Sequence, residues 1–382
     1  MEAFPVPLKI IMEAVKHFIN AIASPKILFN IVFLFYLIVF PPFKFFQRIH
    51  DALGIDRLWT KRGGIFIFSL MFLAFAFGLT DANFRLIVLK PDNVPIVALL
   101  FLVVFFLWFA MTQAKENDEA IAKGDKPKEY ADSREKVLVF PDLVYIEFLC
   151  LIFVAVLLAV WAIGLPAPLE QPANPTVSPN PSKAPWYFLG LQEMLVYFDP
   201  WIAGVVLPTA ILLGLMCIPY IDKNRKGLGY YTYQDRKMAI NTFMFFWLVL
   251  WMFLIFIGTF LRGPNWSFFG PFEYWDHNKL EVLNNINLSQ YVFMIWLKQG
   301  MPSNILLREA PGFLVLAVYF GLLPAIFAKT IFKDLYQRIG GIRYSIFVVF
   351  LLMALALPIK MYLRWLFNIK YIIAIPEFFF NI

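Results

Sequence analysis

Eight stretches of mostly apolar residues, each long enough to cross a bilayer, constrain this chain more than any other feature. A helix needs about 20 apolar residues to span the hydrocarbon core. The chain is 61% hydrophobic and 15% charged, whereas a soluble domain is nearer half apolar and a quarter charged. The sequence therefore predicts an all-α, polytopic transmembrane helix bundle, with spans at 27–46, 64–82, 94–113, 142–164, 201–221, 239–261, 311–330 and 344–366.

Basic residues are concentrated in alternate loops, which predicts the orientation of the chain. The stretch 115–136 holds six Lys or Arg and 223–237 holds five, whereas 165–200 holds one. Because cytoplasmic loops are richer in Lys and Arg, the basic loops are predicted to be cytoplasmic and the loop 165–200 to lie outside. Charges spread between spans in this way argue against nucleic-acid binding. Three basic residues at the far end fall on the outer side against this tendency: Lys360, Arg364 and Lys370.

A polar stretch of mixed charge divides the spans into two groups. The first 26 residues mix charged and apolar residues without the compact apolar core of a signal peptide, so we expect an amphipathic helix on the membrane surface. The predicted segments are a surface leader (1–26), an N-terminal three-helix membrane unit (27–114), a polar cytoplasmic linker (115–140), a main membrane unit (141–335) and an extra C-terminal helix and tail (336–382).

The sequence "SPNPSKAPWYFLGLQEML" (178–195) is unusual in so apolar a chain. Seven prolines occur from 166 to 185, and proline stiffens an extended chain because it cannot continue a helix. The residues from Trp186 to Glu193 then return to helical spacing. Trp and Tyr are enriched at headgroup depth, so we predict a short outer-face interfacial helix whose apolar side covers a site in the membrane.

Three motifs in this region resemble the C-terminal half of cytochrome b, in its separate "subunit IV" form. That family has Asp-Leu-Leu-Tyr entering a helix, a loop with Pro-Ala-Asn-Pro, and a Pro-Glu-Trp-Tyr-Phe signature. This chain supplies the three motifs in the same order and with similar spacing: Asp142-Leu143-Val144-Tyr145, Pro172-Ala173-Asn174-Pro175 and Ala184-Pro185-Trp186-Tyr187-Phe188. The resemblance covers about residues 137–262, or on to 330.

The resemblance implies a membrane subunit of a quinol:cytochrome c oxidoreductase of the bc type, which is not catalytic alone. In such complexes the signature loop walls an outer quinol-oxidation pocket, and quinol binds at the interface between subunits. The expected partners are a haem-b-bearing subunit like the N-terminal half of cytochrome b, a Rieske iron–sulfur protein and a c-type cytochrome. The expected location is the bacterial cytoplasmic (inner) membrane, with the signature loop on the periplasmic face.

The histidines depart from the family pattern. Such a complex needs four histidine ligands for its two b haems, and this chain has only His17, His50 and His277. None lies in a predicted span, and we expect all three to be solvated loop histidines. The sequence also lacks the Cys-x-x-Cys-His motif of c-type haem attachment. Haem b is therefore expected on the partner subunit, without ligands from this chain, and we predict no metal ligands here.

The signature glutamate of the family, which is placed to accept a quinol proton, is Pro185 in this chain. Proline has neither a proton-accepting side chain nor an N–H. Glu193, two helical turns beyond Trp186, is the nearest carboxylate and is the candidate proton acceptor; a structurally paired or headgroup-facing carboxylate is the alternative. Tyr187 is a candidate hydrogen-bonding partner of a quinol oxygen, or an interface anchor.

A second candidate site follows from the motif at the start of the 142–164 span. Glu147 replaces an aromatic position that lies near the inner quinone pocket and an additional haem in chloroplast-type relatives. An ionisable residue inside a span usually faces a cavity or a partner, so Glu147, with Asp142 and Tyr145, is predicted to lie on the inner quinone or haem side. Snorkelling of Glu147 to the surface is the alternative.

The long aromatic loop 262–300 is expected on the outer face. Long loops are often functional, so it is a candidate docking site for the Rieske-type or cytochrome c subunit, with an interfacial aromatic belt as the alternative. The three N-terminal spans contain no histidine, paired carboxylates or phosphate-binding loop, and packing against neighbouring subunits or lipid is their expected use.

Two other functions compete with a quinol-oxidising subunit. Loss of the signature glutamate is compatible with a structural, non-catalytic subunit of a larger respiratory complex. A secondary transporter is the other alternative, but its expected repeats, broken helices and midplane polar groups are hard to find in the sequence.

Overall fold

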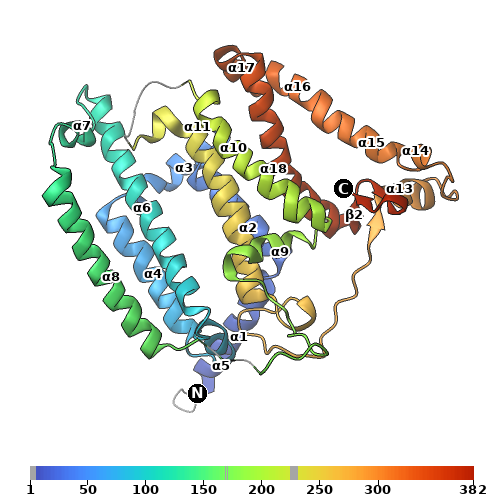
Figure 1. Ribbon diagram of the computed structural model, residues 1–382, viewed down its shortest axis with the longest axis horizontal. Helices are drawn as coiled ribbons and strands as arrows, with labels where there is room; N and C mark the ends of the chain where they lie inside the picture. The colour runs from blue at the N-terminus through green and yellow to red at the C-terminus, as the bar shows by residue number, and fades with distance from the viewer. Residues whose placement is uncertain (1–5, 168, 170, 224–230) are drawn as a thin grey trace. The chain divides into compact units, whose positions relative to one another are not determined.

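The protein is described here by a computed structural model that covers residues 6–167, 169, 171–223 and 231–382 and is mostly helical (Figure 1). Residues 1–5 of the predicted leader, 168 and 170 of the proline loop and 224–230 of a predicted basic loop lie outside this description. The chain divides into two compact units. The first holds the described residues up to 182 with 231–245 and 260–277; the second holds 183–223, 246–259 and 278–382.

The all-α membrane architecture predicted from the apolar runs is confirmed. Within the described residues, seven helices are long and apolar enough to cross a membrane, or up to eight if a bent helix pair forms one span. The seven are Lys61–Gly78, Val94–Ala122, Val139–Gly164, Ile202–Ile221, Tyr233–Leu261, Ala310–Lys329 and Gly341–Phe367. They match seven of the eight predicted ranges.

The first predicted span, 27–46, is wrong in extent. The helix of this region, α2 (Pro25–Val39), ends before Pro41 and Pro42, and a separate helix, α3 (Lys44–Leu53), follows. Neither proline offers a backbone N–H to continue a helix, so the pair ends it. α2 instead forms the bent pair with the preceding helix, at an angle of 83°.

The first unit is built from helices and short helical turns. Its elements are α1 (Val6–Ile22), α2, α3, η1 (Ile55–Leu58), α4 (Lys61–Gly78), α5 (Ala82–Val88), α6 (Val94–Ala122), α7 (Lys128–Asp132), η2 (Val139–Leu143), α8 (Val144–Gly164), α11 (Tyr233–Met244) and η7 (Pro264–Trp266). Figure 1 shows α4, α6 and α8 as long, nearly straight helices.

One buried carboxylate connects α1 to the rest of this unit. Asp81 begins α5 as its N-cap, where its side chain accepts hydrogen bonds from the backbone N–H groups of Asn83 and Phe84 at 2.9 and 3.2 Å. The same carboxylate pairs with Lys16 of α1 at 2.8 Å, and both side chains are almost fully buried. A buried ion pair of this kind is costly to break, since removal of one partner leaves a buried charge.

α4 and α6 approach closely because one residue at the contact is glycine. A Cβ on Gly64 would lie 2.5 Å from the ring of Trp108, whose Nε1 donates to the Thr60 carbonyl at 3.2 Å. α6 continues past the apolar run into the polar stretch predicted as a linker. There the buried Asn117 side chain donates to the Glu129 carboxylate and the Tyr231 carbonyl, so this part of the stretch is ordered.

The second unit holds the remaining helices and all four short strands of the described residues. Its elements are η3 (Trp186–Phe188), α9 (Leu189–Met194), η4 (Ile202–Val206), α10 (Leu207–Ile221), η5 (Phe245–Met252, whose first residue belongs to the first unit), α12 (Phe253–Phe256), η6 (Ile257–Leu261, shared with the first unit), α13 (Leu288–Gln290), η8 (Tyr291–Trp296), α14 (Ile305–Arg308), α15 (Ala310–Ala317), η9 (Val318–Leu322), α16 (Leu323–Lys329), α17 (Lys333–Ile339), α18 (Gly341–Phe367) and η10 (Pro376–Phe378). Strands β1 (Ile286–Asn287) and β2 (Ile369–Tyr371) pair in parallel, and β3 (Ala374–Ile375) and β4 (Phe380–Asn381) pair antiparallel.

The basic residues at the far end of the chain are held inside the second unit. Lys360 and Arg364 of α18 are buried, with 4% and 6% exposure. The Lys360 ammonium donates to the Lys370 carbonyl, and the Arg364 guanidinium donates to the Asn284 and Asn368 carbonyls at 2.8 and 3.1 Å. Backbone carbonyls of the same unit bind the charged ends of Lys360 and Arg364, so these two residues are not solvated loop residues. This contact explains why they do not follow the tendency of Lys and Arg to lie in cytoplasmic loops.

Candidate functional site

Residues 183–198, here called the roof segment, form the short helix predicted after the proline loop. Pro185 precedes η3, and the Phe188 N–H donates to the Pro185 carbonyl at 2.8 Å. The Ala184 N–H donates to the Gln192 side chain at 2.9 Å, which closes the entry to the helix. Lys183 extends to the Thr259 carbonyl at 2.9 Å and joins the start of the segment to the end of the neighbouring helix.

One side of the roof segment packs on the helix that contains α12. Leu189, Gly190, Glu193 and Met194 are buried. A Cβ on Gly190 would lie 3.4 Å from Ile255, and one on Gly258 would lie 3.3 Å from both the Cβ and the carbonyl oxygen of Leu189. Gly258 therefore permits the close contact, since a Cβ there would lie closer to Leu189 than ordinary packing allows, whereas a Cβ on Gly190 would make an ordinary van der Waals contact.

The first turn of the roof segment, η3, is an exposed aromatic surface. Trp186, Tyr187 and Phe188 are 39%, 53% and 52% exposed. Successive rings meet edge to face with centroids 5.6 and 5.7 Å apart, and Tyr187 also contacts Trp251 at 5.7 Å. Contiguous exposed apolar surface of this kind marks a contact with a ligand, a partner or lipid. The predicted pocket residues are thus brought together on one surface.

Glu193 lies on the packed side of the roof segment. Its exposure is 1%, while the three aromatic residues of the predicted pocket are exposed. The chain itself therefore shields this carboxylate from solvent, in the turn that follows the exposed aromatic residues. A buried carboxylate needs polar partners to remain charged, and its role as the proton acceptor stays a prediction.

The residues predicted for the inner side lie at the start of α8. Asp142 belongs to η2, and Tyr145 and Glu147 belong to the first turn of α8. All three are exposed, and no residue of α8 is buried. An apolar helix whose whole surface is exposed in its own chain requires lipid or another subunit around it, so these side chains face the surroundings of this chain.

The predicted docking loop 262–300 is divided between the two units. In the first unit, Asn180 of the proline loop and Asn265 form two hydrogen bonds: the Asn180 Nδ2 donates to Asn265 Oδ1 at 2.8 Å, and the Asn265 N–H donates to Asn180 Oδ1 at 2.7 Å. The proline loop and the start of the docking loop are therefore held together. The membrane face on which the two loops lie stays a prediction.

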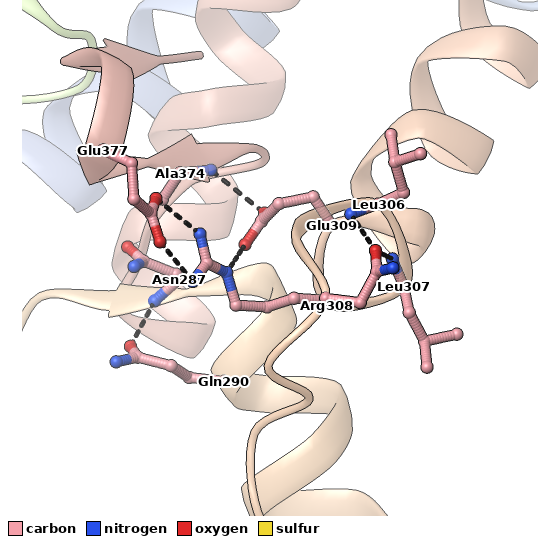
Figure 2. A network of polar contacts seen from close by, with 9 residues as sticks. Asn287, Gln290, Leu306, Leu307, Arg308, Glu309, Ala374 and Glu377 are labelled. Atoms are coloured by element: carbon pink, nitrogen blue, oxygen red, sulfur yellow. Dashed lines mark hydrogen bonds and ion pairs between the residues drawn. The ribbon is translucent and has the colours of Figure 1, made fainter.

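A polar network that the sequence did not predict follows the loop 262–300 in the second unit. Figure 2 shows the Arg308 guanidinium between two carboxylates: it donates to Glu377 at 2.9 and 2.8 Å and to Glu309 at 3.1 Å. Glu309 is 1% exposed and also accepts the Ala374 N–H at 3.0 Å. Arg308 holds the pKa of the Glu377 carboxyl down to about 2. The network thereby ties the C-terminal tail to the start of α15.

The expectation that all three histidines are solvated is correct for two of them. His17 and His277 are exposed, but His50 is 4% exposed. Its ring lies against α2, because the chain turns back between α2 and α3. The adjacent prolines marked that turn in the sequence, but nothing in the residues near His50 indicated what the ring would contact.

One family matches part of the chain. Residues 172–272 match the family described as cytochrome b (C-terminal)/b6/petD, which confirms the resemblance over the Pro-Ala-Asn-Pro loop, the roof segment and the two following spans. The Asp142–Tyr145 motif and the N-terminal spans lie outside the matched residues. No solved structure matches the chain.

Proposed function

We propose that this chain, which carries a cytochrome b C-terminal-like segment at residues 172–272, is a membrane subunit of a quinol:cytochrome c oxidoreductase of the bc type. Families of this kind belong to bc- and b6f-type redox complexes. The roof segment forms part of the outer quinol-oxidation pocket, on the periplasmic face of a bacterial inner membrane. One observation carries this proposal: within the family-matched residues, the Trp186–Phe188 surface is exposed while the turn that follows it, α9, is fixed by packing.

The chemistry of quinol oxidation indicates which cofactors the partner subunits must hold. A quinol gives up two electrons and two protons when it becomes a quinone. The chain has three histidines, fewer than the four ligands that two b haems require, so haem b is held by the partner subunit. A Rieske protein accepts the other electron and passes it to a c-type cytochrome. Cofactors carry the electrons in such systems, while the protein supplies binding and electrostatics.

The residues of the roof segment are assigned to binding and proton transfer. The rings of Trp186 and Phe188 offer flat apolar surface to a quinol ring, and the Tyr187 hydroxyl is a hydrogen-bonding group for its oxygen. Ala184 and Pro185 shape the edge of the pocket. Glu193 accepts a proton from the quinol, because Pro185 has no side chain that can do so.

On the inner side, Glu147 delivers protons to a second quinone with Asp142 and Tyr145 beside it.

The test is quinol-driven cytochrome reduction by the purified complex. General-base catalysis contributes about 10²–10⁴-fold to a rate, so Glu193→Gln is expected to lower turnover by at least about 10²-fold while b-haem absorbance is retained. The matched control is Asp334→Asn, an exposed carboxylate of the same unit on α17, which should leave turnover unchanged. Equal turnover of the Glu193→Gln complex and the native complex would remove this residue from the mechanism.

A structural, non-catalytic subunit is the second candidate, and Pro185 at the glutamate position favours it. If the chain is a structural subunit, it would purify with b haem and an iron–sulfur protein, but quinol oxidation would be absent or insensitive to an outer-site inhibitor. Trp186→Ala separates the two proposals, because only a quinol pocket loses affinity for quinol or inhibitor when this ring is removed.

A further inference from the structure

Three potential metal ligands meet where α3 ends, and they take no part in the proposed quinol chemistry. His50 and Asp51 belong to the last turn of α3, and Asp56 belongs to η1. Gly54 between them has φ of +63°, a left-handed conformation that glycine adopts readily, and this turn brings η1 back towards α3. One ligand atom from each of the three side chains lies within 4.8 Å of the others. We call His50, Asp51 and Asp56 the elbow cluster.

The hydrogen bond on one side of the His50 ring fixes the state of that nitrogen. Nδ1 lies 2.9 Å from the carbonyl oxygen of Ile38 in α2. A carbonyl oxygen can only accept a hydrogen bond, so Nδ1 must carry the hydrogen. The ring is 4% exposed, and this orientation is imposed from outside the cluster, by a helix that contributes no ligand.

The other nitrogen then faces a carboxylate. Nε2 lies 3.1 Å from Oδ1 of Asp56. In the neutral ring with Nδ1 protonated, Nε2 has a lone pair, and two lone pairs at this distance repel each other. A cation that both atoms coordinate would remove this repulsion.

The rest of the cluster favours a metal ion. Two carboxylates and a neutral imidazole carry a charge of −2. The ammonium groups of Lys115 and Lys237 lie nearby but donate to the Asp56 backbone carbonyl and to Gln47, so a divalent cation would be the charge that meets the ligand atoms directly. Metal-binding histidines almost always donate their other N–H to a carbonyl, carboxylate or water, as His50 does to Ile38. Both carboxylates are exposed, so an ion can reach them from solvent.

A second layer of contacts orients the Asp51 carboxylate. Lys237 of α11 donates to Oε1 of Gln47 at 2.7 Å, which leaves the Gln47 Nε2 group as the donor to Asp51 Oδ1 at 2.8 Å. Lys115 of α6 donates to the backbone carbonyl of Asp56 at 2.9 Å. Helices α6 and α11 therefore hold both ends of the cluster in place before any ion binds.

We propose that the elbow cluster binds a first-row divalent cation such as Zn²⁺, with Nε2 of His50 and one oxygen each of Asp51 and Asp56 as ligands and water completing the coordination. Mixed imidazole and carboxylate ligands suit zinc and its neighbours in the first row. The bound ion fastens the end of α3 to η1. This site is independent of the quinol function and stands whether or not that function is correct.

Zinc titration of the purified full chain in detergent, with any histidine tag removed, tests the site. Titration calorimetry should show one equivalent of Zn²⁺ binding. Co²⁺ bound at the same site should give a visible absorption band. Asp51→Asn and Asp56→Asn should each weaken binding by at least about 10-fold, and Gln47→Leu by about 10–100-fold, as measured for outer-layer partners of metal ligands. The matched controls are His17→Asn and Asp92→Asn, exposed residues of the same unit.

Two results would overturn the site. The first is that the native chain binds no Zn²⁺ at any concentration that leaves it folded. Alternatively, the Asp51→Asn and Asp56→Asn chains could bind as tightly as the native chain while their helical circular dichroism is unchanged. Retained circular dichroism also separates loss of ligands from loss of folding.

Discussion

Helices α8 and α12 are both strongly apolar, yet they differ in what covers them. None of the 21 residues of α8 is buried, whereas Phe253, Leu254 and Ile255 of the four-residue α12 are at most 5% exposed. Length and apolar composition predicted both as parts of membrane spans. The difference between them shows that composition predicts a span but does not predict whether the span packs against its own chain.

The contrast has a physical cause in residue size. The contact between α9 and α12 depends on Gly258, where two backbones come close, and small residues are the usual means of close helix packing in membranes. The only glycine of α8 is its last residue, Gly164, which has no contact within 4 Å of a Cβ. Within the described residues of this chain no second helix covers α8, and its exposed apolar side chains suit a surface for another subunit or lipid.

The largest expected effect is a difference between two identical substitutions. Leu254→Ala removes a side chain that is 1% exposed and Leu157→Ala one that is 50% exposed. The first should lower the free energy of unfolding by about 2–5 kcal/mol because it leaves a cavity, and the second by less than about 0.5 kcal/mol. Thermal unfolding of both purified chains in one detergent measures this, and equal losses would end the distinction between the two helices.

Overfilling the contact between α9 and α12 should have the next largest effect. Gly258→Val places new atoms against Leu189 and should cost about 1–3 kcal/mol, with loss of inhibitor-sensitive quinol oxidation because the roof segment shifts. Gly204→Val is the control, since nothing lies within 4 Å of a Cβ there. Full activity of the Gly258→Val complex would show that the position of the roof segment does not matter for turnover.

A smaller effect is expected from the exposed carboxylate of α8. If Glu147 delivers protons to an inner quinone, Glu147→Gln should slow reoxidation of b haem about 10-fold without changing the amount of haem that co-purifies. Flash-induced or stopped-flow haem kinetics measure this step. A rate and inhibitor sensitivity identical to those of the native complex would instead assign Glu147 to the headgroup region.

The smallest expected effect is the loss of the Arg308–Glu377 ion pair at low pH. Because Arg308 lowers the pKa of Glu377 from its ordinary 4.5 to about 2 in the folded chain, this ion pair stabilises the tail above pH about 4.5. That contribution is lost as the pH falls towards 2. The hydrogen-exchange protection factors of residues 369–382, which are corrected for the pH dependence of intrinsic amide exchange, should therefore fall over this range in the native chain. Glu377→Gln removes the titrating group, so its exchange should lack this component; an unchanged pH profile would contradict the assignment.

The sequence predicted the features that depend on neighbouring residues. Apolar runs predicted the spans, and Pro185 followed by residues at helical spacing predicted the roof segment. The features it did not predict depend on contacts between distant residues. Arg364 is held by the Asn284 carbonyl, and a backbone carbonyl leaves no mark in the sequence. His50 contacts the Ile38 carbonyl in the same way, and Leu189 of the roof segment packs on Gly258 of another helix.

The claim that the Trp186–Phe188 surface lines a quinol pocket is tested most directly by photoaffinity labelling. Membranes containing the intact complex would be illuminated with an azidoquinol, and the labelled peptides identified by mass spectrometry. The account predicts label on the peptide containing Trp186, Tyr187 and Phe188, which an outer-site inhibitor suppresses. Label confined to other chains, or label on this peptide that the inhibitor leaves unchanged, would contradict it.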